Sequence, residues 1–268
     1  MSGSRHADPP TSIGKIGRRA FTAIGLAGGA AMLTAGAPTG QPPGGEPTPA
    51  GEDRKTHITM LLYPGTTVLD WIGPYEVLHR VPGVEFVLTA ATTDLMTSDS
   101  GLVDYKANIP LDRIERTDVL IVPGGAQGVM GAAEDPVIAD WLRRIDRTTI
   151  YTVGVCTGSL ILAHIGLLRG RRATTYWKFP SMLEGAGATF VPQRWVRDGK
   201  YWTSAGVSAG IDISLALTAD LYGAKRAMTT QLAIEYDPRP PFDAGSVRTA
   251  PPDVVDALGG IMPPHSHR

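Results

Sequence analysis

The sequence predicts an α/β fold in which a mostly parallel sheet is covered by helices on both faces. Strand-like and helix-like segments alternate from residue 57 to residue 235, which is the pattern of α/β proteins. The strand-like segments are continuously apolar, as expected for strands that are buried on both sides of a sheet. A glycine-flanked turn at residues 154–158 joins one strand directly to a helix. In such a sheet the chemistry gathers at the carboxyl ends of the strands.

The individual elements follow from the distribution of β-branched, aromatic, glycine and proline residues. The predicted strands are 57–63, 84–90, 118–122 and 149–153, with hairpins around 98–101 and at 194–203. The predicted helices are 70–80, 136–147, 159–164, 208–221 and 224–235. Pro64-Gly65 ends the first strand, and Pro136 suits the first turn of its helix.

Composition narrows the function classes. The 268 residues carry a net charge of −1, so there is no electrostatic case for binding nucleic acid or an anionic membrane. A single cysteine excludes an intramolecular disulfide and a cysteine-based zinc cluster. The six histidines have no metal-ligand spacing with a carboxylate. We therefore expect a small-molecule substrate, no metal and no cofactor.

Both ends of the chain differ from the middle. Residues 1–37 contain the pair Arg18-Arg19 followed by a short apolar, glycine-rich stretch, which predicts a twin-arginine export signal and no stable membrane anchor. The alternative is a disordered basic leader. Residues 38–55 are predicted as a Pro/Gly-rich linker, 56–246 as the folded domain and 247–268 as a flexible tail. The predicted location is periplasmic or secreted.

The turn at residues 154–158 resembles a nucleophile elbow and holds the only cysteine, Cys156. Glycines at 154 and 158 would let the strand and the helix approach closely. The side chain would lie near a helix N-terminus, whose dipole is expected to lower the pKa of the thiol. The alternative is a small apolar cysteine that fills the core.

Three predicted strands bring candidate residues to the same edge of the sheet. The first leads to Asp70, the third to Gly124 and Gly125, and the next to Cys156 and Thr157. A carboxyl group beside a thiolate would share a proton with it; the alternative for Asp70 is a helix N-cap. The N–H groups of Gly125 and Thr157 are candidates for an oxyanion hole, although the glycines also suit a tight turn.

Several segments resemble the ThiJ/PfpI superfamily, and in particular its isonitrile hydratases. These segments are 67–74, 122–125, 155–160, 166–175 and 235–245. The resemblance implies a flavodoxin-like sandwich, a homodimer, and addition of water to R–N≡C to give an N-substituted formamide. It also implies that Cys156 is the nucleophile, that Asp70 and Thr157 assist it, and that no cofactor takes part.

Two further residues and two further functions complete the expectations. Trp71, beside Asp70, is a candidate for shaping the substrate pocket. Tyr176 stands where related proteins carry a histidine, and it either packs or lines the pocket. This departure weakens a Cys-His hydrolase mechanism. The alternatives to a hydratase are another ThiJ/PfpI activity, of glyoxalase or amidase type, and a non-catalytic thiol redox sensor or ligand-binding module.

Overall fold

A seven-stranded sheet forms the centre of the fold. The computed structural model describes residues 55–259. Across the sheet the strands are β10 (Trp195–Asp198), β11 (Tyr201–Ser204), β7 (Tyr151–Gly154), β6 (Val119–Val122), β1 (Thr56–Leu61), β2 (Val84–Ala90) and β5 (Ile109–Pro110). β10 and β11 are antiparallel, whereas the other neighbouring strands are parallel. The predicted mostly parallel sheet is confirmed.

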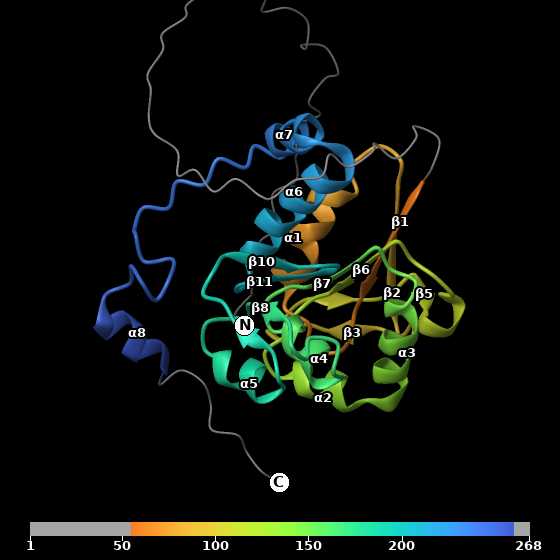
Figure 1. Cartoon of the computed structure of the whole chain (residues 1–268), viewed down its shortest axis with the longest axis horizontal. Helices are drawn as coiled ribbons and strands as arrows, with labels where there is room; N and C mark the ends of the chain where they lie inside the picture. Colours follow the sequence, from red (N-terminus) through yellow and green to blue (C-terminus); the bar gives the residue numbers. More distant parts are fainter. Residues whose placement is uncertain (1–54, 260–268) are drawn as a thin grey trace, which may run out of the picture. The chain divides into compact units, whose positions relative to one another are not determined.

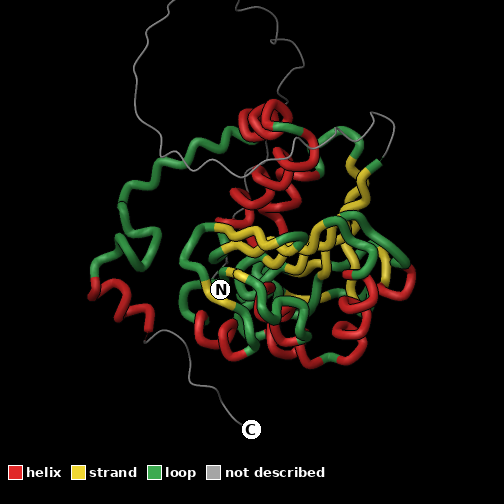
Figure 2. The backbone as a smooth tube through the Cα atoms, in the orientation of Figure 1, coloured by secondary structure: helices red, strands yellow, loops and turns green. Residues whose placement is uncertain are grey.

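Helices cover both faces of this sheet (Figures 1 and 2). One face carries α1 (Val68–Leu78) and α6 (Ala209–Tyr222), with α7 (Ala224–Ala233) packed on α6. The other face carries α2 (Gly128–Glu134), α3 (Pro136–Asp146), α4 (Gly158–His164) and α5 (Pro180–Gly185). The predicted three-layer sandwich is therefore present.

Two hydrophobic clusters hold the layers together, and successive strand residues alternate between them. Leu61 on β1 packs in the same cluster as Leu142 of α3. Its neighbour Met60 packs with Leu78 of α1 and Ile213 of α6. Because both faces of the strand are buried, its sequence is continuously apolar, which is the signal that predicted the strand.

Some elements were not predicted. They are α2, α5, the 3₁₀ turn η1 (Leu111–Arg113), the short strands β5, β8 (Arg172–Ala173) and β9 (Thr189–Phe190), and the helix α8 (Pro252–Gly259). α8 lies inside the segment that we expected to be a loose tail. The hairpin predicted around residue 98 consists of β3 (Met96–Thr97) and β4 (Asp104–Tyr105). α2 is a short run of glycine and alanine without strong apolar periodicity, so its sequence gives little helical signal.

The predicted export signal, residues 1–37, lies outside the described residues, as does the predicted linker up to residue 54. The export signal therefore stays a prediction. Within residues 55–259, no helix combines the length and the apolar character that a membrane crossing requires.

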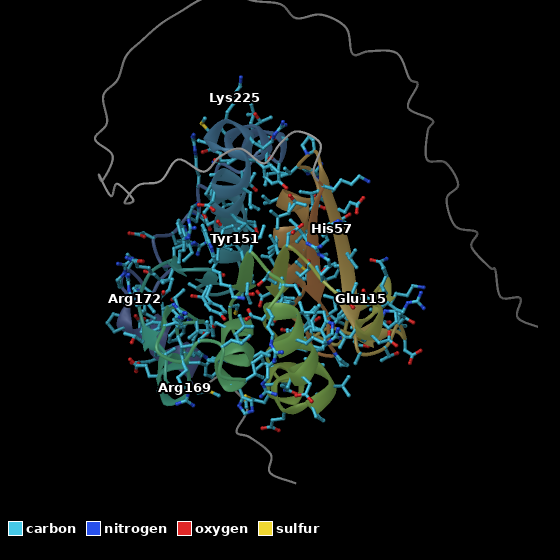
Figure 3. All side chains as sticks on the ribbon, turned by 45° about the vertical axis from the view of Figure 1, so that its right-hand side comes forward. His57, Glu115, Tyr151, Arg169, Arg172 and Lys225 are labelled. Carbon is cyan, nitrogen blue, oxygen red and sulfur yellow. The ribbon has the colours of Figure 1, made fainter. Side chains whose placement is uncertain are left out.

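Charged side chains of both signs lie on the outside of the fold (Figure 3). Glu115, Arg169, Arg172 and Lys225 are all exposed. Neighbouring opposite charges also pair, as Arg143 Nη1 does with Asp140 Oδ1 at 3.0 Å. Exposed pairs of this kind contribute little to stability, so the two core clusters carry most of it.

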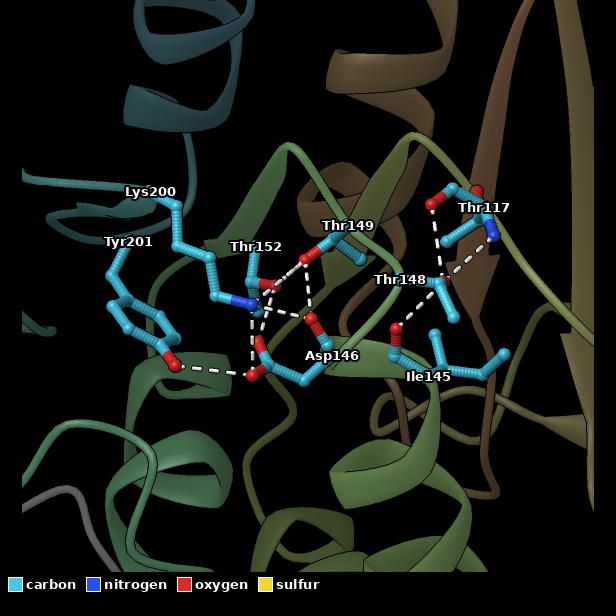
Figure 4. Close-up of polar contacts among 8 residues, drawn as sticks. All are labelled: Thr117, Ile145, Asp146, Thr148, Thr149, Thr152, Lys200 and Tyr201. Carbon is cyan, nitrogen blue, oxygen red and sulfur yellow. Dashed lines mark hydrogen bonds and ion pairs between the residues drawn. The ribbon is translucent and has the colours of Figure 1, made fainter.

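The amino ends of β7 and β11 meet at a buried polar network around Asp146, the last residue of α3 (Figure 4). Its carboxylate lies 2.9 Å from Lys200 Nζ, and it accepts hydrogen bonds from Thr152 Oγ1 at 2.7 Å and Tyr201 OH at 3.1 Å. Since each partner is satisfied, the network joins helix and strands without leaving a buried charge unpaired. We expect the active site at the opposite end of the sheet, where the carboxyl ends of the parallel strands lie.

Candidate active site

The turn between β7 and α4 has the predicted elbow geometry. Cys156 has a φ of 55°, a left-handed conformation that is uncommon for a residue with a side chain. A Cβ atom at Gly154 would lie 2.8 Å from the Ser159 Cα, and one at Gly158 would lie 2.0 Å from the Val122 carbonyl oxygen. Both glycines are therefore required by the close approach of strand and helix. The Cys156 carbonyl accepts a hydrogen bond from the Ser159 hydroxyl at 2.7 Å, which fixes the turn.

Asp70 reaches the same point from the first turn of α1. Its side chain is buried, with 0% of the residue exposed, and Thr67 rather than Asp70 is the N-cap of α1. A Cβ atom placed on Gly124 would lie 2.5 Å from Asp70 Oδ2 and also 2.5 Å from Thr157 Oγ1. The carboxyl group and the hydroxyl therefore converge on Gly124, at the end of β6. The aligned registers of β1, β6 and β7 produce this convergence.

The environment of the Asp70 carboxyl group favours its protonated form. Among the described residues, neither of its oxygens makes a hydrogen bond of ordinary geometry. Burial raises the pKa of Asp70 to about 7, although the nearby Cys156 thiol and Gly124 N–H oppose part of this rise. A carboxyl group with a pKa near neutrality can both give and take a proton, which suits general acid–base catalysis.

The thiol of Cys156 is held in its neutral form, so the expected lowering of its pKa is wrong. Burial, and then the neighbouring Asp70 carboxylate, raise the pKa of Cys156 to about 12. The backbone N–H groups of Val207 and Thr157 lower this pKa only in part. The residue is 5% exposed, and loss of hydration outweighs the field at the start of the short helix α4. Attack by sulfur therefore needs a base, and Asp70 is the nearest one.

Thr157 positions the loop that holds the two glycines. Its hydroxyl accepts a hydrogen bond from the Gly125 N–H at 3.1 Å and donates one to the Gly125 carbonyl at 3.2 Å. The Gly125 N–H is therefore already occupied, contrary to the expected oxyanion role. A Cβ atom at Gly125 would lie 2.3 Å from the Gly65 carbonyl oxygen, so this glycine is required by packing.

Trp71 and Tyr176 both pack against the hydrophobic cluster that contains Cys156. Trp71 is half-buried against the Tyr105 ring, with the ring centroids 5.7 Å apart. Its indole N–H is buried and makes no hydrogen bond within the described part of the chain. Tyr176 is also half-buried and packs over Gly206, where a Cβ atom would lie 2.5 Å from the ring. It lies close enough for a negative charge on Cys156 to raise its pKa, so it packs and faces the site at once.

Two residues near the thiol were missed by sequence reasoning. Thr175 donates a hydrogen bond to the Cys156 carbonyl at 3.2 Å. Val207 has a φ of 32° and presents its backbone N–H to the sulfur. Thr175 lies in one of the segments that carry the ThiJ/PfpI resemblance, which is a weak signal. Val207 acts through its backbone, and no side-chain pattern could have identified it.

No three histidine, cysteine, aspartate or glutamate side chains between residues 55 and 259 are grouped as a metal site would require. Next to Cys156 there is instead a cleft of about 280 Å³, bordered by Thr175, Tyr176 and Val207. The chemistry available to the site is thus that of a buried thiol–carboxyl pair with access to a small organic molecule.

Comparison with known proteins agrees with this fold and this elbow. Residues 56–220 match the model of the DJ-1/PfpI family. The chain is 43% identical to the isonitrile hydratase of Pseudomonas putida over 199 residues, which is 74% of this chain and 86% of that enzyme. This chain belongs to the DJ-1/PfpI family, and the resemblance to ThiJ/PfpI proteins is confirmed.

Two further comparisons concern structure and function. A crystal structure of a ThiJ/PfpI family protein from Pseudomonas syringae superimposes with a TM-score of 0.74 at 38% identity, covering 76% of this chain and 84% of that one. The HTH-type transcriptional regulator CdhR of Pseudomonas aeruginosa is 32% identical over 63% of this chain, but the match covers only 52% of the regulator. Similarity to this family therefore extends to proteins of different function, and the site must decide between them.

Proposed function

We propose that this protein adds water to small isonitriles and releases N-substituted formamides. The observation that carries this proposal is the buried pair of Cys156 and Asp70: the thiol is neutral, and the carboxyl group, with a pKa of about 7, can take up or release a proton near physiological pH. The 43% identity to an isonitrile hydratase supports it. The terminal carbon of an isonitrile is an electrophile, and sulfur is a good nucleophile towards it.

The first half of the proposed reaction joins the thiol to the substrate. Sulfur of Cys156 attacks the terminal carbon of R–N≡C while the Asp70 carboxylate takes the thiol proton. Asp70 then gives this proton to the same carbon, and the product is the thioimidate R–N=CH–S–Cys156. Because the carboxylate takes the proton as the bond forms, the high pKa of the thiol is no obstacle.

The second half removes the product. Water adds to the thioimidate carbon while Asp70 takes one of its protons and passes this proton to the nitrogen. As the C–S bond breaks and the C=O bond forms, Asp70 takes the hydroxyl proton and passes it to the sulfur, and R–NH–CHO leaves. One water is consumed in the cycle and both side chains return to their initial states. Thr157 keeps Gly124 and Gly125 in place beside the carboxyl group throughout.

The test is turnover of cyclohexyl isocyanide by the full chain and three variants. We expect formamide production to be lost in Cys156→Ala and in Asp70→Asn. Glu76→Gln is the matched control, because Glu76 lies on the same helix but forms an exposed pair with Arg80. If the folded wild-type protein makes no formamide, the proposal is wrong.

Export and dimerisation belong to the same proposal. Arg18-Arg19 supports export by the twin-arginine route, and family resemblance supports a homodimer. Replacing both arginines with lysine should keep the protein in the cytoplasm. Light scattering of the purified protein would test the dimer.

A further inference from the structure

A cleft lies beside the turn that holds Cys156, although Cys156 itself is not among its lining residues. Three residues that surround Cys156 also line it: Thr175, Tyr176 and Val207. Its volume is about 280 Å³, close to the lower end of the range for sites that hold small organic ligands, about 300–1,000 Å³. A molecule whose reactive carbon contacts the sulfur would place its substituent in this cleft.

The outer wall of the cleft comes from a distant part of the sequence. Residues 245–248 line it, although they follow α7 and precede α8. Figure 1 shows the chain running from α7 to α8 without regular structure. α8 is held beside α5, because Lys178 Nζ hydrogen bonds to the Leu258 carbonyl. Both ends of the wall are thus attached to helices. The wall crosses the predicted boundary at residue 246 between the folded domain and the flexible tail.

The lining of the cleft is mainly apolar. Trp177, Phe190 and Val247 contribute to it. The guanidinium of Arg194 also borders the cleft, but it pairs with Asp212 at 2.7 Å and donates to the Ser208 hydroxyl at 3.1 Å. Its charge is therefore largely neutralised. A second arginine, Arg248, also lines the cleft and is exposed. The lining therefore favours a compact hydrocarbon group over a cationic one.

We propose that this cleft is the subsite for the substituent R, that residues 245–248 form its outer wall, and that it takes a branched or cyclic hydrocarbon group. This inference rests on the proposed function for the identity of the reactive group. Val247 is the best residue for a test, because its side chain lines the cleft while the residue is 47% exposed, so that substitution should not disturb the core.

The first test compares cyclohexyl isocyanide with methyl isocyanide. In Val247→Trp the cleft is narrowed, and we expect the ratio of kcat/KM for cyclohexyl to that for methyl to fall about tenfold or more. Val247→Gly widens the cleft and should raise the ratio of kcat/KM for a bulkier substrate, adamantyl isocyanide, to that for methyl isocyanide. Val254→Trp is the matched control, because Val254 is 42% exposed on α8 and does not line the cleft. A ratio that is the same in Val247→Trp and wild type would overturn the subsite.

The second test needs no hydratase activity. Cys156 is the only cysteine, so alkylation by N-cyclohexyl and N-methyl iodoacetamide can be followed by mass spectrometry at one position. We expect Val247→Trp to slow the cyclohexyl reagent selectively. If it does, but wild type hydrates no isonitrile, then the reaction assigned above is wrong and the subsite stands. If wild type hydrates isonitriles, but Val247→Trp changes neither the kcat/KM ratio nor the ratio of the two alkylation rates, then the subsite is wrong and the reaction stands.

Discussion

Replacement of Gly124 by alanine adds only one methyl group, yet it should strongly disturb the site. The added Cβ would lie 2.5 Å from Asp70 Oδ2, 2.5 Å from Thr157 Oγ1 and 2.8 Å from the Thr157 nitrogen. Ordinary van der Waals contact begins at 3.4 Å, so the carboxyl group and the hydroxyl must each retreat by about 1 Å. They cannot retreat freely, because Asp70 is fully buried and Thr157 is hydrogen bonded to Gly125.

The expected loss of activity follows from this displacement. A shift of about 1 Å in a catalytic group costs on the order of 100-fold in rate, which corresponds to about 2.7 kcal/mol of transition-state stabilisation. Overpacking should also lower the free energy of unfolding, by about 1–3 kcal/mol. Gly124→Ala should therefore remain folded at moderate temperature but lose most of its turnover of cyclohexyl isocyanide.

Gly131→Ala is the control for this experiment. Gly131 lies in α2, and a Cβ there would meet nothing within 4 Å. Alanine should stabilise this helix by about 0.5–1 kcal/mol and leave turnover unchanged. The measurements are kcat/KM, the melting temperature, and the pH dependence of Cys156 alkylation. If Gly124→Ala keeps the turnover and the alkylation profile of wild type, then Asp70 and Thr157 do not converge on this glycine as described.

Two further predictions concern stability. Burial raises the pKa of Asp70 to about 7 from 3.8, so the folded state binds the extra proton; the contribution of Asp70 to stability is complete below pH 4 and is lost as the pH rises through about 7. Asp70→Asn should therefore raise the free energy of unfolding above pH 7, by about 4 kcal/mol at most, and have little effect on it below pH 4. Urea unfolding of both proteins at both pH values would test this. An equal change in the free energy of unfolding at the two pH values would contradict it. Lys200→Met removes the cation beside the buried Asp146 and should cost about 2 kcal/mol without loss of turnover. The exposed Lys225→Met should cost nothing measurable, and equal melting temperatures for the two lysine variants would show that the Asp146 network is not needed.

The sheet and the convergence of residues at its carboxyl edge could be predicted because both depend on local patterns. β6 is continuously apolar, and β1 and β7 are rich in β-branched and apolar residues. A parallel arrangement of these strands brings their carboxyl ends to the same edge of the sheet. The nucleophile elbow could also be predicted from a local pattern, since a strand, a turn flanked by two glycines and a helix follow one another without interruption. Asp70, Gly124 and Cys156 could therefore be assigned to one site before their distances were known.

The electrostatics of the site could not be predicted in the same way. The helix N-terminus beside Cys156 is visible in the sequence, but the burial that raises the pKa of the thiol arises from the packing of segments distant in the sequence, including Trp202 and Ile213. The hydrogen bonds between Thr157 and Gly125 likewise depend on which atoms face each other across the turn. The wall at residues 245–248 has no apolar periodicity at all, so it was indistinguishable from a tail.

The high pKa of the Cys156 thiol also bears on the choice between a catalyst and a redox sensor. Burial, and then the Asp70 carboxylate, raise the pKa of the thiol far above neutrality, so the resting thiol is protonated, and peroxide reacts with the thiolate. A sensor would need the opposite environment, with a cation or free N–H groups around an accessible sulfur. A nucleophile that loses its proton to Asp70 during attack needs no thiolate in the resting state, and it gains protection from oxidation between turnovers. The carboxyl group that suppresses the thiolate is therefore the same group that makes the thiol reactive towards a bound electrophile, which favours catalysis over sensing.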